Sequence, residues 1–286
     1  MIRFGPSGNS ASFYNEGHKS TLETAAWLKT RGLDAFEYSF GRGVNISEAL
    51  AAAIGKEMLS CGIAVSCHAP YYINLCNPDD ESAVKSFQYL EKSVRAVKLM
   101  GGDRVVFHPG YINKDGAEAS LKLAMERMEA FLNRFDETGL DGFILCPETM
   151  GKHSQLGTYQ QVIEICNLDK RLIPAFDIGH INSYYNGSLK TKDDYKKIID
   201  YALEHLGKEK TKRLHIHFSK IQYGAKGEIR HLDFSDRVYG PDFEPLAEAL
   251  CEYKLQPRVI CESAENMAED ALQMKEIYGK INKYVR

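Results

Sequence analysis

Six short apolar runs, each ending in a histidine, an aspartate or a glutamate, constrain the fold of this chain more than any other feature. They are AVSCHAP (His68), RVVFHPG (His108), FILCPET (Glu148), LIPAFDIGH (Asp177 and His180), RLHIHFSK (His215 and His217) and RVICES (Glu262). Each run has the length and the β-branched or aromatic content of a buried strand. Because the active sites of parallel α/β barrels lie at the carboxyl ends of their strands, we expect these side chains to converge on one polar mouth.

Two further runs, within residues 1–10 and at Ala35–Phe40, bring the expected strands to eight, and helical segments alternate with them. Ser20 with Glu23, and Ser47, have the positions of helix N-caps. We therefore predict one α/β domain over residues 1–286, a single (β/α)8 TIM barrel. A doubly wound open sheet is the alternative, but no Gly-rich phosphate-binding sequence follows the first strand. We expect a long polar loop over residues 221–242.

Charge and cysteine content limit the location and partners of the protein. The net charge of −3 gives no overall basic field, which lowers the expectation of nucleic-acid binding without excluding it. The seven cysteines have no paired spacing, which is typical of free thiols in a reducing cytoplasm. There is no signal-peptide pattern, and no apolar run approaches the roughly 18 residues that a membrane span needs. We expect a cytoplasmic monomer that does not contact membranes.

The polar residues of the mouth have the chemistry of metal ligands. The candidates are the imidazoles of His68, His108, His180, His215 and His231 and the carboxylates of Glu148, Asp177 and Glu262. Mixed nitrogen and oxygen donors suit Zn²⁺ or Mn²⁺. One histidine at a strand end is more often structural than a ligand, but burying the whole set without metal would be costly.

The number of candidates exceeds what one tetrahedral zinc needs, so we infer at least two metals with a bridging carboxylate. Such a pair activates water and stabilises a leaving oxygen in phosphoester hydrolysis. His217 shares a strand face with His215 and is a further possible ligand or substrate contact.

At these residues the sequence resembles the endonuclease IV family, the family-2 abasic-site endonucleases. The matching segments are HAPYYINLCNP (68–78), VVFHPG (105–110), ETMGKHSQLGT (148–158), FDIGHINSYYNG (176–187), HIHFSK (215–220) and CES (261–263). The resemblance implies a TIM barrel that holds three zinc ions and hydrolyses the DNA backbone 5′ to abasic sites in base excision repair. By position it assigns His68 and His108 to one zinc, Asp177, His215 and Glu262 to a second, His180 and His231 to a third, and Glu148 as the catalytic bridge between the first two.

The same resemblance implies a surface for duplex DNA with an abasic site. Tyr71 and Tyr72 fall where the family inserts side chains into the base stack, and such wedges bend a duplex. Arg42 lies near the position of the family's DNA-penetrating arginine. Four basic residues of the expected mouth loops could contact phosphates, or could be ordinary solvated charges: Lys152, Lys220, Lys226 and Arg230.

The sequence departs from the family pattern at the third zinc. The family has Asp-Arg-His there, whereas this chain has Ile229, Arg230 and His231. Either Glu228 or Asp233 replaces the missing carboxylate, or the third metal is lost. We therefore expect two bound zinc ions, and the sequence does not decide whether a third metal binds. Mn²⁺ is an alternative to zinc at one position.

The sequence is compatible with three functions. The first is a zinc-dependent hydrolase, an apurinic/apyrimidinic endodeoxyribonuclease. The second is a metal-dependent sugar isomerase or epimerase of the xylose isomerase-like superfamily, which the chain also resembles. That resemblance implies one metal held by two Glu, one Asp and one His, a set that Glu148, Asp177, His215 and Glu262 supply. The third is a metal-stabilised binding module. The pair His68 and His108 distinguishes the first two, because only a multinuclear hydrolase needs both as ligands.

Overall fold

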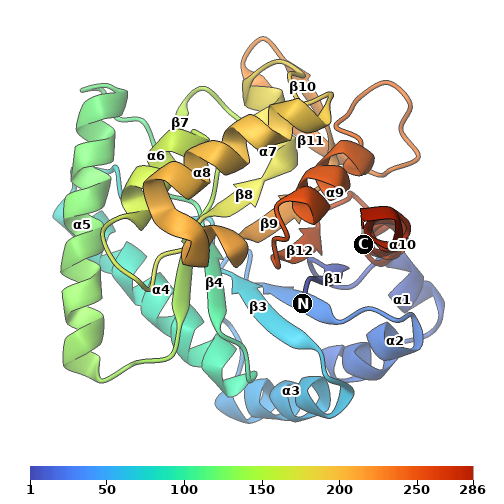
Figure 1. The fold of residues 1–286 in the computed structure, drawn as a ribbon. Coiled ribbons are helices and arrows are strands. Elements are labelled where there is room, and N and C mark those ends of the chain that lie inside the picture. The colour runs from blue at the N-terminus through green and yellow to red at the C-terminus, as the bar shows by residue number, and fades with distance from the viewer. Residues whose placement is uncertain (286) are drawn as a thin grey trace.

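Eight parallel strands form a closed barrel in the structure, a computed structural model that describes residues 1–285 (Figure 1). The barrel strands are β1 (Arg3–Pro6), β2 (Ala35–Ser39), β3 (Ala64–His68), β4 (Arg104–Phe107), β6 (Ile144–Pro147), β8 (Ala175–Asp177), β9 (His215–Phe218) and β12 (Arg258–Cys261). They form two four-stranded sheets, in the orders β1-β12-β9-β8 and β2-β3-β4-β6. Parallel bridges from Ser7 to Glu37 and from Glu148 to Ala175 join the two sheets. The predicted (β/α)8 barrel is therefore confirmed.

Helices surround the barrel on the outside (Figure 1). They are α1 (Ala11–Asn15), α2 (Thr24–Thr30), α3 (Glu48–Cys61), α4 (Asp80–Leu99), α5 (Ala117–Thr138), α6 (Tyr159–Cys166), α7 (Ile178–Tyr184), α8 (Lys192–Lys212), α9 (Phe243–Glu252) and α10 (Met267–Val285), with a 3-10 turn at Thr21–Glu23. The side chain of Ser47 accepts a hydrogen bond from the Leu50 amide and caps α3. Ser20 and Glu23 form the expected capping box at the 3-10 turn. These caps satisfy amide groups that have no partner within a helix.

The hydrophobic core lies between the strands and the helices. It includes Phe4, Leu28, Phe87, Phe135 and Phe243, each at most 2% exposed. The last helix, α10, packs beside β1, so the two ends of the chain meet on one side of the barrel (Figure 1). All seven cysteines lie in the described part of the chain as free thiols, and only Cys61 is partly exposed. Among residues 1–285, no helix has the length and apolar content needed to cross a membrane.

The segment after β9 differs from the expected loop. Residues 221–242 begin with an antiparallel hairpin, β10 (Lys220–Gly224) and β11 (Gly227–Leu232). Its turn requires Gly227, which has a φ of 92° and whose Cβ would lie 2.1 Å from the Gly151 carbonyl oxygen. The outer face of the hairpin is solvent-exposed, so its sequence lacks the apolar alternation that predicts a strand.

Two smaller features were also missed. Helix α7 begins directly after β8, and the Asp177 carboxylate caps it by accepting a hydrogen bond from the His180 amide at 2.6 Å. Strands β5 (Gly110–Tyr111) and β7 (Gln155–Leu156) pair beside the mouth of the barrel. Short elements of this kind fall below the window over which hydrophobic periodicity is informative.

The close approach of β1 to β2 yields a test of the packing. A Cβ at Gly5 would lie 1.7 Å from the Ala35 carbonyl oxygen, whereas a Cβ at Gly279 in α10 meets no atom within 4 Å. We expect Gly5→Ala to lower the free energy of unfolding by roughly 1–3 kcal/mol or more, because the strands must separate. The matched change Gly279→Ala should raise it by about 1 kcal/mol, the gain in helix propensity. Urea unfolding of both variants measures the difference, and equal stabilities would contradict this packing.

Candidate metal centre

The carboxyl ends of the barrel strands surround a polar cleft of about 320 Å³. Its lining residues are Ser39, His68, Tyr71, His108, Tyr111, Met150, Lys152, Gln155, His180, Glu228, His231 and Glu262. Beneath the cleft lie the buried side chains of Glu148, Asp177 and His217. Three groups of these residues place nitrogen and oxygen atoms within 4.8 Å of one another, a spacing that a metal ion can bridge.

Glu148 is the centre of the first group. It follows β6 directly and is fully buried. Its Oε2 lies 3.0 Å from Nε2 of His68 and 3.1 Å from Nε2 of His108. Its Oε1 lies 2.9 Å from Nδ1 of His217. The two oxygens of one carboxylate thus face two different sets of nitrogens, as a bridging carboxylate must.

The second group joins Glu148 to Asp177, His217 and Glu262. Oε2 of Glu262 lies 3.4 Å from Nδ1 of His217. Asp177 is fully buried, and its Oδ2 has no hydrogen-bond partner among the described residues. Burial raises the pKa of Asp177 to about 6. A buried carboxylate oxygen without a partner is costly, and a cation would satisfy it. This donor set therefore fits a divalent metal.

The third group consists of Asp177, His180 and His231. The rings of His180 and His231 have centroids 5.3 Å apart. Oε2 of Glu228 lies 3.5 Å from Nε2 of His180. Ile229, at the position where the family has its carboxylate, is 56% exposed. The hairpin therefore brings Glu228, the neighbour of Ile229, to this group.

Asp233 lies elsewhere. Its Oδ1 accepts hydrogen bonds from the backbone amides of Glu265 and Asn266. Of the two carboxylates that could replace the missing aspartate, the structure brings Glu228 to the third group and uses Asp233 to hold a loop.

Two histidines have the ring orientation of metal ligands. Nδ1 of His68 lies 2.8 Å from the Ala69 carbonyl oxygen, and Nδ1 of His180 lies 2.9 Å from the Thr149 carbonyl oxygen. Because only an N–H group can donate a hydrogen bond to a carbonyl, Nδ1 is the donor in each ring. Nε2 is then the nitrogen that can bind a metal in the cleft. A second hydrogen bond of this kind commonly orients metal-binding histidines.

The positions of His215 and His217 differ from the expectation. The sequence indicated His215 as the ligand and His217 as only a possible one. Strand pairing sets Asp177 beside His217, and Ala175 beside His215. His215 therefore lies two residues, roughly 6–7 Å, deeper in the barrel. His217 contacts Glu148, whereas His215 lies 3.0 Å from Glu37. The structure thus places His217, and not His215, with Glu148, Asp177 and Glu262.

Glu37 is a buried carboxylate that the sequence analysis did not select. It lies in the middle of β2 with no exposed surface, and Ser66 donates a hydrogen bond to its Oε2 at 2.8 Å. Burial opposes its ionisation, but the charge of His217 and the contacts with His215 hold its pKa well below the usual range. One signal could have found it: a charged residue within the otherwise apolar run AFEYSF.

The carboxylates set the protonation of the histidines around them. Burial disfavours the charged form of His68, but the hydrogen bond to Glu148 outweighs this and raises its pKa to about 9. The charge of Asp177 likewise overcomes burial and raises the pKa of His180 to about 9. Burial dominates at His215 and lowers its pKa to about 4. Without metal, protons on His68 and His180 therefore balance part of the buried negative charge.

The aromatic residues expected to meet DNA lie on the rim of the cleft. Tyr71 is 45% exposed and Tyr72 is 52% exposed, and their ring centroids are 5.3 Å apart. Arg42 is exposed, and its Nε donates a hydrogen bond to the Tyr71 hydroxyl at 3.3 Å. The three side chains form one exposed group beside the proposed metal ligands.

The basic residues divide into exposed and buried ones. Lys152 lines the cleft, and Lys226 and Arg230 are exposed on the hairpin. Lys220 is only 8% exposed, and its ammonium donates to the Asp236 carbonyl oxygen at 2.7 Å. Lys220 thus holds the loop after the hairpin, and its ammonium is not presented to a ligand.

The sequence of the chain is similar to those of known proteins. Residues 25–277 match the family described as xylose isomerase-like TIM barrel. An uncharacterized protein of Methanocaldococcus jannaschii is 29% identical over 283 residues, 98% of each chain. A probable endonuclease 4 of Staphylococcus carnosus is 30% identical over 164 residues, 55% of this chain and 53% of its own.

Two solved structures have the same fold over nearly the whole chain. A D-tagatose 3-epimerase-like protein superposes with a TM-score of 0.72 at 20% identity and covers 100% of both chains. The endonuclease IV of Thermus thermophilus superposes with a TM-score of 0.69 at 17% identity and covers 99% of both chains.

The raised pKa values of His68 and His180 predict a pH-dependent metal affinity. Below about pH 9 both rings carry protons that a cation must displace. The apparent affinity for Zn²⁺ or Mn²⁺ should therefore rise between pH 6.5 and 8.5, by about tenfold per pH unit for each proton released. Calorimetric titration in two buffers of different ionisation enthalpy counts these protons. Binding that releases none and does not change with pH would contradict the arrangement.

Proposed function

The chain belongs to the xylose isomerase-like TIM barrel family, and we propose that within it the protein is a metal-dependent phosphodiesterase that cuts DNA 5′ to abasic sites. The observation that carries the proposal is the position of Glu148 between two sets of nitrogens. His68 and His108 face one of its oxygens, and His217 faces the other. A bridge of this kind serves a multinuclear site, which hydrolysis of a phosphodiester uses.

The three groups of the mouth would divide the proposed metals among them. His68, His108 and Glu148 would hold the first, and Glu148, Asp177, His217 and Glu262 the second. Asp177, His180 and His231 would hold a third, with Glu228 nearby. Zinc suits this mixture of imidazole and carboxylate donors, and Mn²⁺ is the alternative. Bound cations would supply activated water and stabilise the charge that develops on the phosphate.

The residues around the metals would bind and position the DNA. The exposed rings of Tyr71 and Tyr72 are placed to wedge into a base stack, and Arg42 holds one of them by its hydroxyl. Extrusion of a nucleotide costs least where a base is already missing. Lys152 and Arg230, exposed at the cleft and on the hairpin, are the candidates for phosphate contacts. The name of the Staphylococcus carnosus relative agrees with this proposal.

A sugar epimerase is the alternative, and one group of residues favours it. Glu148, Asp177, His217 and Glu262 alone supply two Glu, one Asp and one His around a single metal. The two glutamates would then also move protons to and from the substrate. This function leaves His68 and His108 without a role as ligands. One divalent ion per chain, with epimerisation of a ketose and no nicking of DNA, would establish the alternative.

We expect Glu148→Gln to abolish DNA incision while the fold persists. The substitution keeps the size of the side chain but removes the charge that holds the histidines, so activity should fall by a hundredfold or more, about the loss that weakened metal binding causes. The assay is nicking of a duplex that contains a tetrahydrofuran abasic analogue, with and without a chelator. Glu57→Gln, on the exposed face of α3, is the matched control and should retain activity. Incision by Glu148→Gln at the wild-type rate would remove the bridge from the mechanism.

Tyr71 and Tyr72 on the rim of the cleft should affect DNA binding without affecting metal binding. Replacing Tyr71 and Tyr72 together by Ala removes the wedge, and the affinity for abasic duplex should fall by about tenfold, the loss of one or two stacking contacts. The double change to Phe keeps both rings and should retain most of the affinity. Fluorescence anisotropy with abasic and intact duplexes measures the difference, and metal content should be equal in both variants. If the Ala variant still discriminates abasic duplex as well as the wild type, the rim does not read the lesion.

A further inference from the structure

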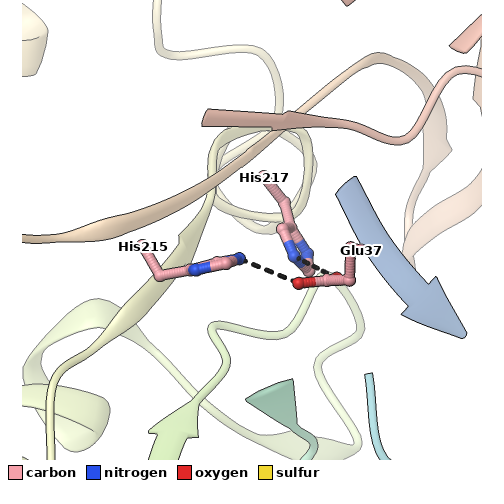
Figure 2. Close-up of side chains that lie close together, drawn as sticks. All are labelled: Glu37, His215 and His217. Carbon is pink, nitrogen blue, oxygen red and sulfur yellow. Dashed lines mark ion pairs between the residues drawn. The ribbon is translucent and has the colours of Figure 1, made fainter. Parts of the chain in front are cut away.

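A second polar group lies inside the barrel, one layer beneath the mouth. Figure 2 shows Glu37 of β2 facing His215 and His217 of β9. Oε2 of Glu37 lies 3.0 Å from Nε2 of His215, and its Oε1 lies 2.9 Å from Nε2 of His217. All three side chains have no exposed surface. Glu37 and His215 belong to none of the three groups of the mouth, so this interior group shares only His217 with them.

The two short contacts of the interior group are not hydrogen bonds. Although the atoms are 2.9–3.0 Å apart, Oε1 of Glu37 and Nε2 of both histidines have no hydrogen-bond partner. By contrast, Nε2 of His68 does form a hydrogen bond with Glu148 at 3.0 Å. Nδ1 of His215 also has no hydrogen-bond partner. Residues 1–285 contain eight buried side-chain atoms without a partner, and four of them belong to this group. A buried polar atom that stays without a partner is unfavourable.

A cation between the three side chains would fit these distances and give the buried atoms a partner. A metal about 2.0–2.2 Å from each donor leaves neighbouring donors roughly 3 Å apart. The lone pair of each ring nitrogen then points at the metal and not at the carboxylate oxygen. A shared proton requires the opposite, because an N–H must point at its acceptor. The donor atoms of Glu37, His215 and His217 lie within 4.8 Å of one another, a spacing that one ion can bridge.

We propose that Glu37, His215 and His217 bind a divalent cation inside the barrel, separate from the ions of the mouth. Two imidazoles and one carboxylate form a donor set that zinc uses, and Mg²⁺ and Ca²⁺ prefer oxygen ligands. The second oxygen of Glu37 completes four donors. Ser66, which donates to that oxygen, would orient the carboxylate from outside.

His217 connects the interior site to the mouth. Its Nε2 faces Glu37, and its Nδ1 forms a 2.9 Å hydrogen bond with Oε1 of Glu148. While the mouth holds no ion, Nδ1 carries a proton and donates to Glu148, as the other N–H of a metal-binding imidazole commonly does. With an ion on each side, Nδ1 would lose this proton and the ring would bridge the interior ion and the second ion of the mouth. The interior ion would thereby fix the ring of His217 and the position of Glu148. The inference does not depend on the proposed substrate, since Glu37 and His215 contact none of the other mouth residues that would hold metal.

The test is a count of zinc in the protein, loaded with Zn²⁺ and freed of excess. Native mass spectrometry should give one zinc fewer per chain for Glu37→Gln and for His215→Gln than for the wild type. Glu57→Gln, which removes a carboxylate on the exposed face of α3, is the matched control and should keep the wild-type count. His180→Gln should lose zinc from the mouth only. Brief chelation should leave one slowly exchanging zinc in the wild type and none in Glu37→Gln.

Equal zinc counts in the wild type and in both folded interior variants would overturn the site and leave Glu37 as a partner that only orients His217. Circular dichroism checks the fold of each variant. If both variants unfold, crystals of the zinc-loaded wild type decide. An anomalous peak among Glu37, His215 and His217 supports the site, and peaks confined to the mouth refute it without affecting the proposed hydrolase.

Discussion

The burial of several carboxylates in one small volume is the constraint on which the rest of the structure depends. Glu37, Glu148 and Asp177 have no exposed surface, and Glu262 joins Glu148 and Asp177 at the mouth. Such groups repel one another and lose hydration, so positive charge must lie beside them. The histidines supply it as protons, and metal ions could supply it instead. The same side chains can therefore support a folded apo protein and a loaded site, which explains why polar groups replace part of an apolar barrel interior.

The fold and the position of the site followed from one pattern in the sequence. Apolar runs of strand length, each closed by a ligand-type residue, predicted parallel strands whose carboxyl ends meet. His68, His108 and Glu148 do come together at the mouth, and so do Asp177 and Glu262. This part was predictable because it depends only on where each strand ends. Whether those residues bind metal remains a prediction that the experiments address.

The rest could not be predicted because it depends on pairing between strands. His215 and His217 share a strand face, and only the register with β8 sets which of them reaches Glu148. Glu37 is informative only once β2 is known to face β9 across the barrel. The choice of Glu228 over Asp233 depends on a hairpin whose exposed sequence carries no strand pattern. For His217 and Glu228 no local signal was present, and for Glu37 the charge within an apolar run indicates burial but not its partners. In each case a contact distant in sequence decided the outcome.

The hairpin of β10 and β11 lies outside the barrel, yet it carries Glu228 and His231 to the side chains of the mouth. Substitutions at Glu228 or His231 would change the number of donors around Asp177 while the barrel strands keep their sequences. Some donors of the mouth are thus carried by a segment that is not a barrel strand. A barrel built in this way can gain or lose donors at its mouth through changes in that segment alone.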